Sequence, residues 1–241
     1  MSFDLSRLAE TERNAMLTAW VEVLACHRAL KKGGLNVVGE VLKGQGDFVE
    51  FDHYPTDDVF DNESHSQYYY HAHRGSEDVG DGRTEHGHFH LFLRASGMPV
   101  GCRPIDYPLA TDVWPTGDEA LSHLVAISMD EWGMPIGLFC TNRWVTAEAW
   151  YPAEQVIAML DRFSIDHASP NWAVNRWITA MVRLCRPQIE FLLRQRDQVV
   201  ADWQKSHPGE DVFEDRALEI TGHLAISVPD MIEQLQQLES K

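Results

Sequence analysis

Two short segments with alternating side chains constrain the fold of this chain more than any other feature. Residues 66–73 read SQYYYHAH, and residues 86–94 read HGHFHLFLR. Side chains two residues apart lie on the same face of a β-strand, so each segment predicts a strand with one face that carries histidines. The intervening residues 75–85, GSEDVGDGRTE, are rich in glycine and aspartate, which predicts a hairpin loop between the strands.

The histidines of this hairpin are candidate metal ligands. His71 and His73 lie on the first strand, and His86, His88 and His90 lie on the second. Directly opposed Cβ atoms of antiparallel strands are ~4.5–5.5 Å apart, and Zn–N bonds are ~2.0–2.1 Å long, so opposed histidines can converge on one ion. A surface or core cluster of histidines without a ligand is the alternative interpretation.

The register of the hairpin decides whether these histidines form one site. The two histidine rows share a face if the numbers of paired residues have an odd sum, as when His73 pairs with His86. An even sum places His71 and His73 beside Phe89 and Leu91, where buried imidazoles lack evident hydrogen-bond partners. We therefore predict the odd register.

Three further residues of the hairpin are candidates for catalysis. Tyr69 shares the face of His71, and Arg74 follows the first strand, so either side chain can orient a substrate. Glu85 opens the second strand and supplies a carboxylate. The sequence leaves open whether His123, which we assign to the face of Val125 on a later strand, or His223 joins the site.

Imidazole and carboxylate donors suit several divalent transition metals, of which we expect zinc, iron or manganese. Three protein ligands leave a coordination position for water or a substrate. The sequence therefore predicts a transition-metal-binding protein, and favours a metal-dependent oxygenase or hydrolase that acts on a small molecule. A non-enzymatic metal- or ligand-binding module is an alternative.

The run His86-Gly87-His88-Phe89-His90-Leu91-Phe92 resembles the histidine-triad motif, in which histidines alternate with apolar residues. That family cleaves nucleoside phosphoramidates and related nucleotides, with the middle histidine as nucleophile. The resemblance implies a metal-free nucleotidyl or phosphoryl transferase or hydrolase in which His88 is the nucleophile. Gly87 stands where the motif has an apolar residue, and about 150 residues follow the motif, which normally lies near the end of a short domain.

The run His71-Ala72-His73-Arg74-Gly75-Ser76-Glu77 is similar to the first cupin motif, His-x-His-x₃-Glu. Residues of that motif bind a metal inside a β-barrel, so this resemblance implies metal ligands in the first strand. The chain lacks the flanking glycines and the second motif of that family.

The charge of the chain restricts its partners. The formal net charge is −17, and residues 44–90 hold eleven acidic residues against two arginines. Such a surface repels phosphate backbones and anionic lipids but attracts cations, so we expect neither nucleic-acid nor membrane partners. The N-terminus has no signal-peptide pattern, no apolar run is long enough for a membrane span, and the four cysteines are scattered, so we expect a cytoplasmic protein. The oligomeric state is not predicted.

The remaining patterns predict an α+β fold, a single domain over residues 1–241. An antiparallel β-sheet, open or barrel-like, carries the histidine-rich hairpin and is packed by an N-terminal helix and a C-terminal helical region. We assign residues 1–34 to the N-terminal helix, 47–142 to the β-rich core and 152–241 to the mostly helical part. Within the core, 47–54 is predicted as a strand and 56–65 as a polar loop. Pro187 is expected to kink or break a long helix.

Overall fold

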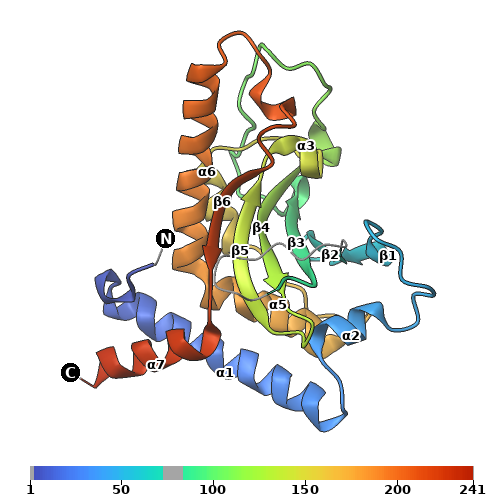
Figure 1. Ribbon diagram of the computed structural model, residues 1–241, viewed down its shortest axis with the longest axis vertical. Coiled ribbons are helices and arrows are strands. Elements are labelled where there is room, and N and C mark those ends of the chain that lie inside the picture. Colours follow the sequence, from blue (N-terminus) through green and yellow to red (C-terminus); the bar gives the residue numbers. More distant parts are fainter. Residues whose placement is uncertain (1–2, 73–83, 241) are drawn as a thin grey trace.

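The computed structural model describes residues 3–72 and 84–240, and these residues form an α+β fold (Figure 1). Six strands form one antiparallel sheet in which the spatial order follows the chain order. The two outermost strands, β1 and β6, are not paired with each other, so the sheet of the described residues is open and not closed into a barrel. The strands are β1 (Tyr54–Phe60), β2 (Ser66–His71), β3 (Gly87–Arg94), β4 (Leu121–Met129), β5 (Pro135–Thr141) and β6 (Ile220–Ala225).

Helices from both ends of the chain pack around this sheet. α1 lies along α5, and α6 packs against β5 and β6 (Figure 1). The predicted long helix is broken into α5 and α6, and Pro187 lies in the first turn of α6, where a missing N–H costs no helical hydrogen bond. The α-helices are α1 (Glu10–Lys32), α2 (Val37–Leu42), α3 (Arg143–Thr146), α4 (Ala153–Leu160), α5 (Trp172–Leu184), α6 (Arg186–Ser206) and α7 (Val228–Glu239).

The helices cover the apolar face of the sheet. Phe89 of β3 packs against Trp177 of α5, with 6.0 Å between ring centroids, and Trp177 is completely buried. His27 of α1 also stacks on the indole ring of Trp177. The Tyr68 hydroxyl of β2 donates a hydrogen bond to the side-chain oxygen of Asn175 (2.7 Å). This face is therefore the hydrophobic core, and the residues between these positions along each strand point to the other face.

The strand predicted at 47–54 is wrong, and the strand lies in the region predicted as a polar loop. β1 begins at Tyr54 and pairs with β2 alone, as an edge strand. Tyr54 and Val59 are buried, whereas Asp57 is exposed. An edge strand tolerates proline and charged side chains because one of its sides makes no ladder hydrogen bonds, which explains Pro55 and the acidic composition.

The remaining strands and the last helix complete the fold. β4 and β5 form a hairpin, β6 is a short strand that precedes α7, and the Ser227 side chain caps α7 by accepting a hydrogen bond from the backbone N–H of Asp230. Between β3 and β4 the chain forms only short 3₁₀ turns, η2 (Ala95–Gly97) and η3 (Gly117–Glu119). Among residues 3–72 and 84–240, no helix is both long and apolar enough to span a membrane. All four cysteines are free thiols.

Candidate metal centre

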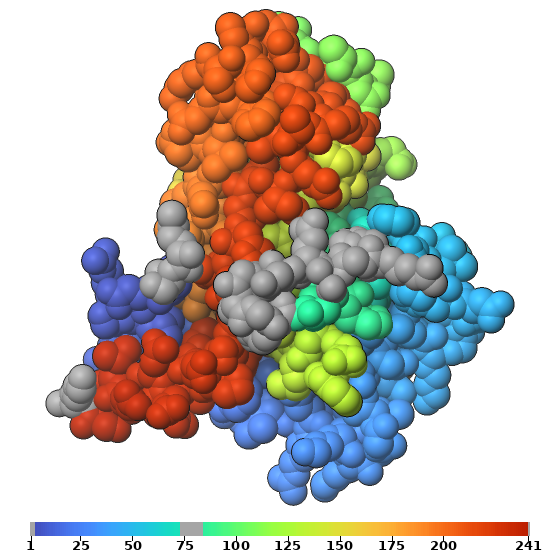
Figure 2. Space-filling view, viewed as in Figure 1, coloured from blue at the N-terminus to red at the C-terminus, as the bar shows by residue number. Residues whose placement is uncertain are grey.

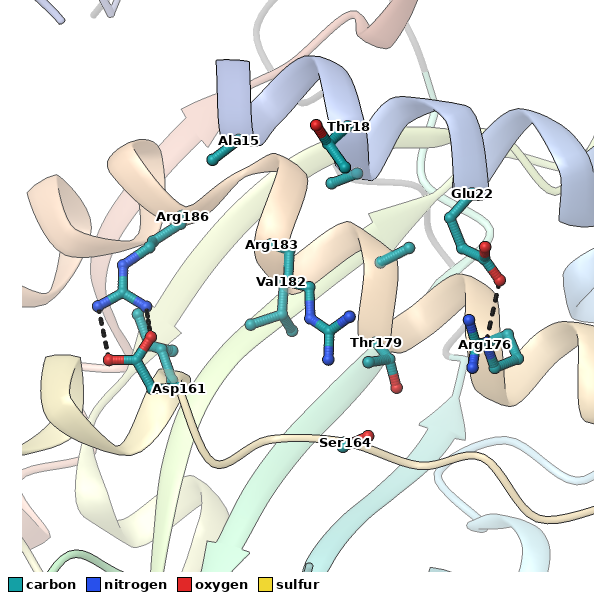
Figure 3. Close-up of a pocket in the computed structure, with 13 residues that line it drawn as sticks. Ala15, Thr18, Glu22, Asp161, Ser164, Arg176, Thr179, Val182, Arg183 and Arg186 are labelled. Carbon is teal, nitrogen blue, oxygen red and sulfur yellow. Dashed lines mark hydrogen bonds and ion pairs between the residues drawn. The ribbon is translucent and has the colours of Figure 1, made fainter. Parts of the chain in front are cut away.

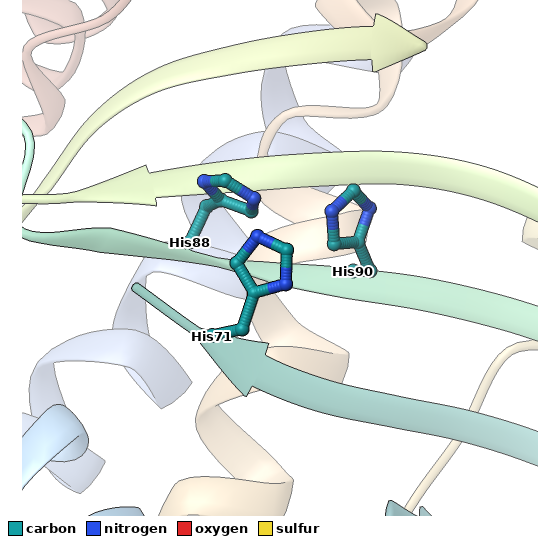
Figure 4. Close-up of side chains that lie close together, drawn as sticks. All are labelled: His71, His88 and His90. Carbon is teal, nitrogen blue, oxygen red and sulfur yellow. The ribbon is translucent and has the colours of Figure 1, made fainter. Parts of the chain in front are cut away.

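The pairing of β2 with β3 brings histidines of both strands to one face. Tyr69 lies opposite His90, and His71 lies opposite His88. The paired numbers have an odd sum, which confirms the predicted register. His71, His88 and His90 therefore converge on the face opposite Phe89, two from β3 and one from β2 (Figure 4).

The three rings lie at a spacing suited to one ion. The centroids of His71 and His88 are 4.4 Å apart, those of His88 and His90 4.7 Å, and those of His71 and His90 5.4 Å. If one nitrogen is taken from each ring, the three nitrogens all lie within 4.8 Å of one another. A tetrahedral ion with ~2.0–2.1 Å bonds requires nitrogens about 3.4 Å apart. An ion bound by all three rings would therefore draw these nitrogens closer together than the 4.8 Å limit.

His90 is the most deeply buried of the three. Its exposed fraction is 1%. Burial, reinforced by the neighbouring histidines, lowers the pKa of His90 well below its usual value, so the ring is neutral near neutral pH. Nε2 of His90 is buried, and no donor or acceptor in the described chain forms a hydrogen bond with it. A buried nitrogen without a partner costs free energy, and a metal ion would supply the missing partner.

Glu85 orients the ring of His88. The Glu85 carboxylate lies 2.6 Å from Nδ1 of His88. When Nδ1–H donates to this carboxylate, Nε2 keeps its lone pair for a metal, an arrangement common among histidine ligands. Glu85 is therefore placed to hold the ring of His88 in position, and not to contact a substrate directly.

His123 plays the same part for His90. Nε2 of His123 lies 3.0 Å from Nδ1 of His90, and both rings are buried. Burial, with the nearby Arg196 charge, lowers the pKa of His123 to about 3, so this ring is neutral. The backbone of Val125 favours a proton on His123, consistent with a ring N–H that donates there. Nε2 of His123 then accepts from His90 Nδ1–H, which leaves His90 Nε2 as a metal-binding lone pair.

A bulge brings His123 to this face, so its predicted placement beside Val125 is wrong. β4 pairs Val125 with Leu91, but the next pair is His123 with Phe92, which leaves Leu124 as an extra residue. An extra residue reverses the alternation on one side of the bulge. His123 consequently contacts the ring of Phe92, with 5.2 Å between centroids.

His86 is turned away from the cluster, and its predicted place beside His88 is wrong. Its Nδ1 lies 2.6 Å from the hydroxyl of Tyr70, on the apolar side of β2, and the two rings stack. The backbone N–H of His86 bonds to Met129, the residue that also pairs with Gly87. Two residues thus face one, as in a β-bulge, and the strict alternation begins only after Gly87.

Tyr69 lies beside the cluster, as predicted, and has a partner that the sequence did not suggest. Its ring centroid is 5.1 Å from that of His90. The ring of His53 stacks on Tyr69 at 3.6 Å, and Asp58 holds Nδ1 of His53 at 2.9 Å. Burial raises the pKa of Tyr69, so its phenol stays protonated and is a hydrogen-bond donor. His73 and Arg74, the other predicted hairpin residues, lie outside the described residues.

Phe139 of β5 forms an apolar wall that sequence reasoning also missed. Its centroid lies 4.9 Å from that of His88. The pairing places Ala126 between His90 and Phe139, and this small residue allows the phenyl ring to reach across β4. His223 of β6 pairs with Phe139 and shares the histidine face, but it is not one of the three clustered residues.

The chain before β1 borders the same site. The backbone N–H of Phe51 donates to the carbonyl of Ala72 (3.0 Å), and the Phe51 ring is 6.4 Å from the ring of His71. In the space-filling view this part of the chain, in light blue with β1, forms one side of the molecule (Figure 2). Phe51 is largely exposed, so the site has an aromatic residue at its rim.

No match was found among curated proteins or among solved structures. A family model described as a domain of unknown function, DUF6969, matches residues 17–226. This range covers most of the chain and contains the whole sheet with its histidine cluster. The chain therefore belongs to the DUF6969 family.

Proposed function

We propose that this protein binds one divalent transition-metal ion through His71, His88 and His90, as the centre of a metal-dependent hydrolase or oxygenase. The observation that carries the proposal is the buried Nε2 of His90, which has no hydrogen-bond partner in the described chain and lies within a cluster of three imidazoles. Glu85 and His123 support the proposal, because Glu85 lies at hydrogen-bond distance from Nδ1 of His88 and His123 from Nδ1 of His90.

Three imidazole ligands leave a coordination position for water or a substrate, where the ion acts as a Lewis acid. Imidazole donors suit zinc and iron in particular, with manganese as a further candidate. The net charge of −17 favours the approach of a cation to the site. A metal-binding module without catalytic activity has the same ligands and differs only in lacking turnover.

The surroundings of the cluster support a small-molecule substrate. Phe92 and Phe139 form apolar walls next to His90, and the protonated phenol of Tyr69 offers a donor beside the ligands. Apolar walls with few polar groups are typical of small-molecule sites. Tyr69 is accordingly our candidate for orienting the substrate.

The Glu85–His88 bond also favours a second candidate, metal-free nucleotidyl transfer with His88 as nucleophile. A carboxylate on Nδ1 makes Nε2 of an imidazole more nucleophilic. However, the first histidine of that motif, His86, is bonded to Tyr70 and does not join His88 and His90. We therefore favour the metal. A covalent nucleotidyl adduct on His88 in metal-free protein would favour the second candidate instead.

Metal binding should raise the melting temperature, and acid should remove the effect. Ligand histidines must be neutral, so protons compete with metal as the pH falls through and below the usual histidine pKa of about 6.5. Burial already keeps His90 neutral below that value, so its own competition begins at lower pH. The measurement is the difference in melting temperature between protein with excess zinc or iron(II) and protein with chelator, from pH 8 to pH 5. We expect a rise near neutral pH that shrinks on acidification. No difference at any pH at which the chain is folded would count against the proposal.

Replacing Glu85 or His123, which form hydrogen bonds with the proposed ligands, should weaken metal binding without abolishing it. Glu85→Gln removes the negative charge of the carboxylate next to His88 Nδ1. His123→Phe removes the acceptor for His90 Nδ1–H. Changes of this kind typically weaken metal binding ~10–100-fold. Competition with a coloured chelator measures the affinity. Asp130→Asn, in the β4–β5 turn, is the control and should bind metal like the parent; a similar loss in all three variants would contradict these roles.

A further inference from the structure

A groove in the helical layer is a second candidate site, remote in sequence from the histidine hairpin. It lies between α1, α5 and the segment that follows α4, and has a volume of about 510 Å³ (Figure 3). Sites for small ligands usually have volumes of ~300–1,000 Å³. The groove is therefore large enough for a compact organic molecule.

Three arginines line this groove, although the chain as a whole is strongly acidic. Arg176 donates from Nε to Glu22 of α1 (3.0 Å). Arg186 bonds to Asp161 and, from Nε, to Glu190 (2.9 Å). These ion pairs hold the two outer guanidinium groups at opposite ends of the groove (Figure 3).

Arg183 lies between them and differs from both. Its side chain projects from α5 into the middle of the groove (Figure 3). Within residues 3–72 and 84–240, no carboxylate or other acceptor forms an ion pair or hydrogen bond with this guanidinium, in contrast to Arg176 and Arg186. Carboxylates thus pair with the guanidinium groups of Arg176 and Arg186, whereas no ion pair within the described residues offsets the charge of Arg183.

The rest of the lining suits an apolar body next to an anionic headgroup. Ala15 and Ala19 of α1 and Leu160 of α4 are apolar lining residues, and the two alanine side chains are small. Ser164 lies on the side opposite α1 (Figure 3) and adds a hydroxyl group. An unpaired guanidinium has five donors in a planar fork that matches the oxygens of a carboxylate or phosphate.

We propose that this groove binds a small organic anion, with a phosphoryl or carboxyl headgroup on Arg183 and an apolar body against Ala15 and Ala19. Arg176 and Arg186 are held by their carboxylate partners at the two ends of the groove, so Arg183 supplies the charge that the headgroup meets. The proposal is independent of the metal site, since it uses none of its residues.

Calorimetric titration of the full chain with phenyl phosphate, benzoate and inorganic phosphate tests the proposal. We expect phenyl phosphate or benzoate to bind more tightly than inorganic phosphate, and the tighter of the two identifies the headgroup. Arg183→Gln should weaken that binding at least tenfold, because a charge-assisted hydrogen bond is lost. Ala15→Leu should weaken it as well, because the larger side chain fills the groove.

Arg162→Gln is the matched control, since Arg162 is exposed, lies outside the groove and carries the same charge. It should bind the probes like the parent. Arg183 makes no hydrogen bond or ion pair within the described chain, so Arg183→Gln should also melt at nearly the parent temperature. Failure of all three probes to bind the parent, or equal binding by the parent and Arg183→Gln, would overturn the proposal. The second result would also arise if the probes bound at the metal site instead.

Discussion

His90→Ala is expected to abolish stoichiometric metal binding, whereas His86→Ala should leave it nearly unchanged. His90 supplies the buried Nε2 that lacks a hydrogen-bond partner in the described chain, while His86 bonds to Tyr70 on the other face of the sheet. Loss of a residue that forms a hydrogen bond with a metal ligand typically lowers metal affinity ~10–100-fold, so loss of the ligand itself should lower it more than about 100-fold. Metal content after dialysis, with affinity from chelator competition, measures both variants.

The comparison is sharp because the two histidines are only four residues apart and belong to the same sequence pattern. His86→Ala removes one hydrogen bond to Tyr70 and should lower stability modestly, by roughly 1 kcal/mol, without loss of metal. His88→Ala and His71→Ala should behave like His90→Ala. Equal metal loss in the His86 and His90 variants would show that the bulge before β3 does not separate them, and the three-histidine site would be wrong.

Gly87→Val is expected to destabilise the protein and to disturb the metal site together. A Cβ atom at this position would lie 2.5 Å from the His71 carbonyl oxygen, 2.5 Å from the Tyr70 hydroxyl and 2.7 Å from the Ala72 Cβ. The first of these contacts is with backbone, which cannot move without separating β2 from β3. Overpacking of this kind typically costs ~1–3 kcal/mol and occasionally more, and here it also displaces His71 from His88. Chemical denaturation and metal titration measure the two effects.

Gly222→Ala serves as the control, because it also adds a side chain to a sheet glycine. The nearest contact of its Cβ would be 3.3 Å from a terminal carbon of Leu192, a flexible side-chain end that can shift. We expect a smaller loss of stability and parent-like metal binding. If Gly87→Val matched the parent in both measurements, the close approach of β2 and β3 at this position would be wrong. The same crowding explains why Gly87 stands where the histidine-triad motif has an apolar residue.

The central hairpin was predictable because its signal is local. Alternation over a few residues specifies the faces of β2 and β3, and the cost of burying His71 without partners specifies the register. The break between α5 and α6 follows in the same way from one residue, Pro187. These inferences needed no knowledge of what the distant parts of the chain do.

The errors arose where the regular period is interrupted. The irregular pairings next to His86 and at Leu124 each add one residue, which turns a histidine to the other face. Gly87 is a signal for the first, because a glycine within a strand often marks a bulge, whereas the residue type at Leu124 gives no sign of the second. The edge strand β1 was mistaken for a loop because an exposed edge carries the polar residues that also mark turns. Alternation therefore identifies the faces of a strand only where the pairing is regular.

The remaining members of the site come together only through tertiary structure. Phe139 reaches His88 across β4 because Ala126 is small, and His53 stacks on Tyr69 from the chain before β1. Such contacts join segments far apart in the sequence or depend on the size of a residue on a third strand. No spacing rule in a single sequence specifies them.

Elemental analysis of the full chain, purified without a histidine tag, tests the central proposal most directly. After incubation with zinc, iron(II) or manganese and removal of unbound ion, we expect about one equivalent of one of these metals per chain, and none in the His90→Ala variant. Folded parent protein that retains no metal under these conditions would contradict the assignment of His71, His88 and His90 as a metal centre.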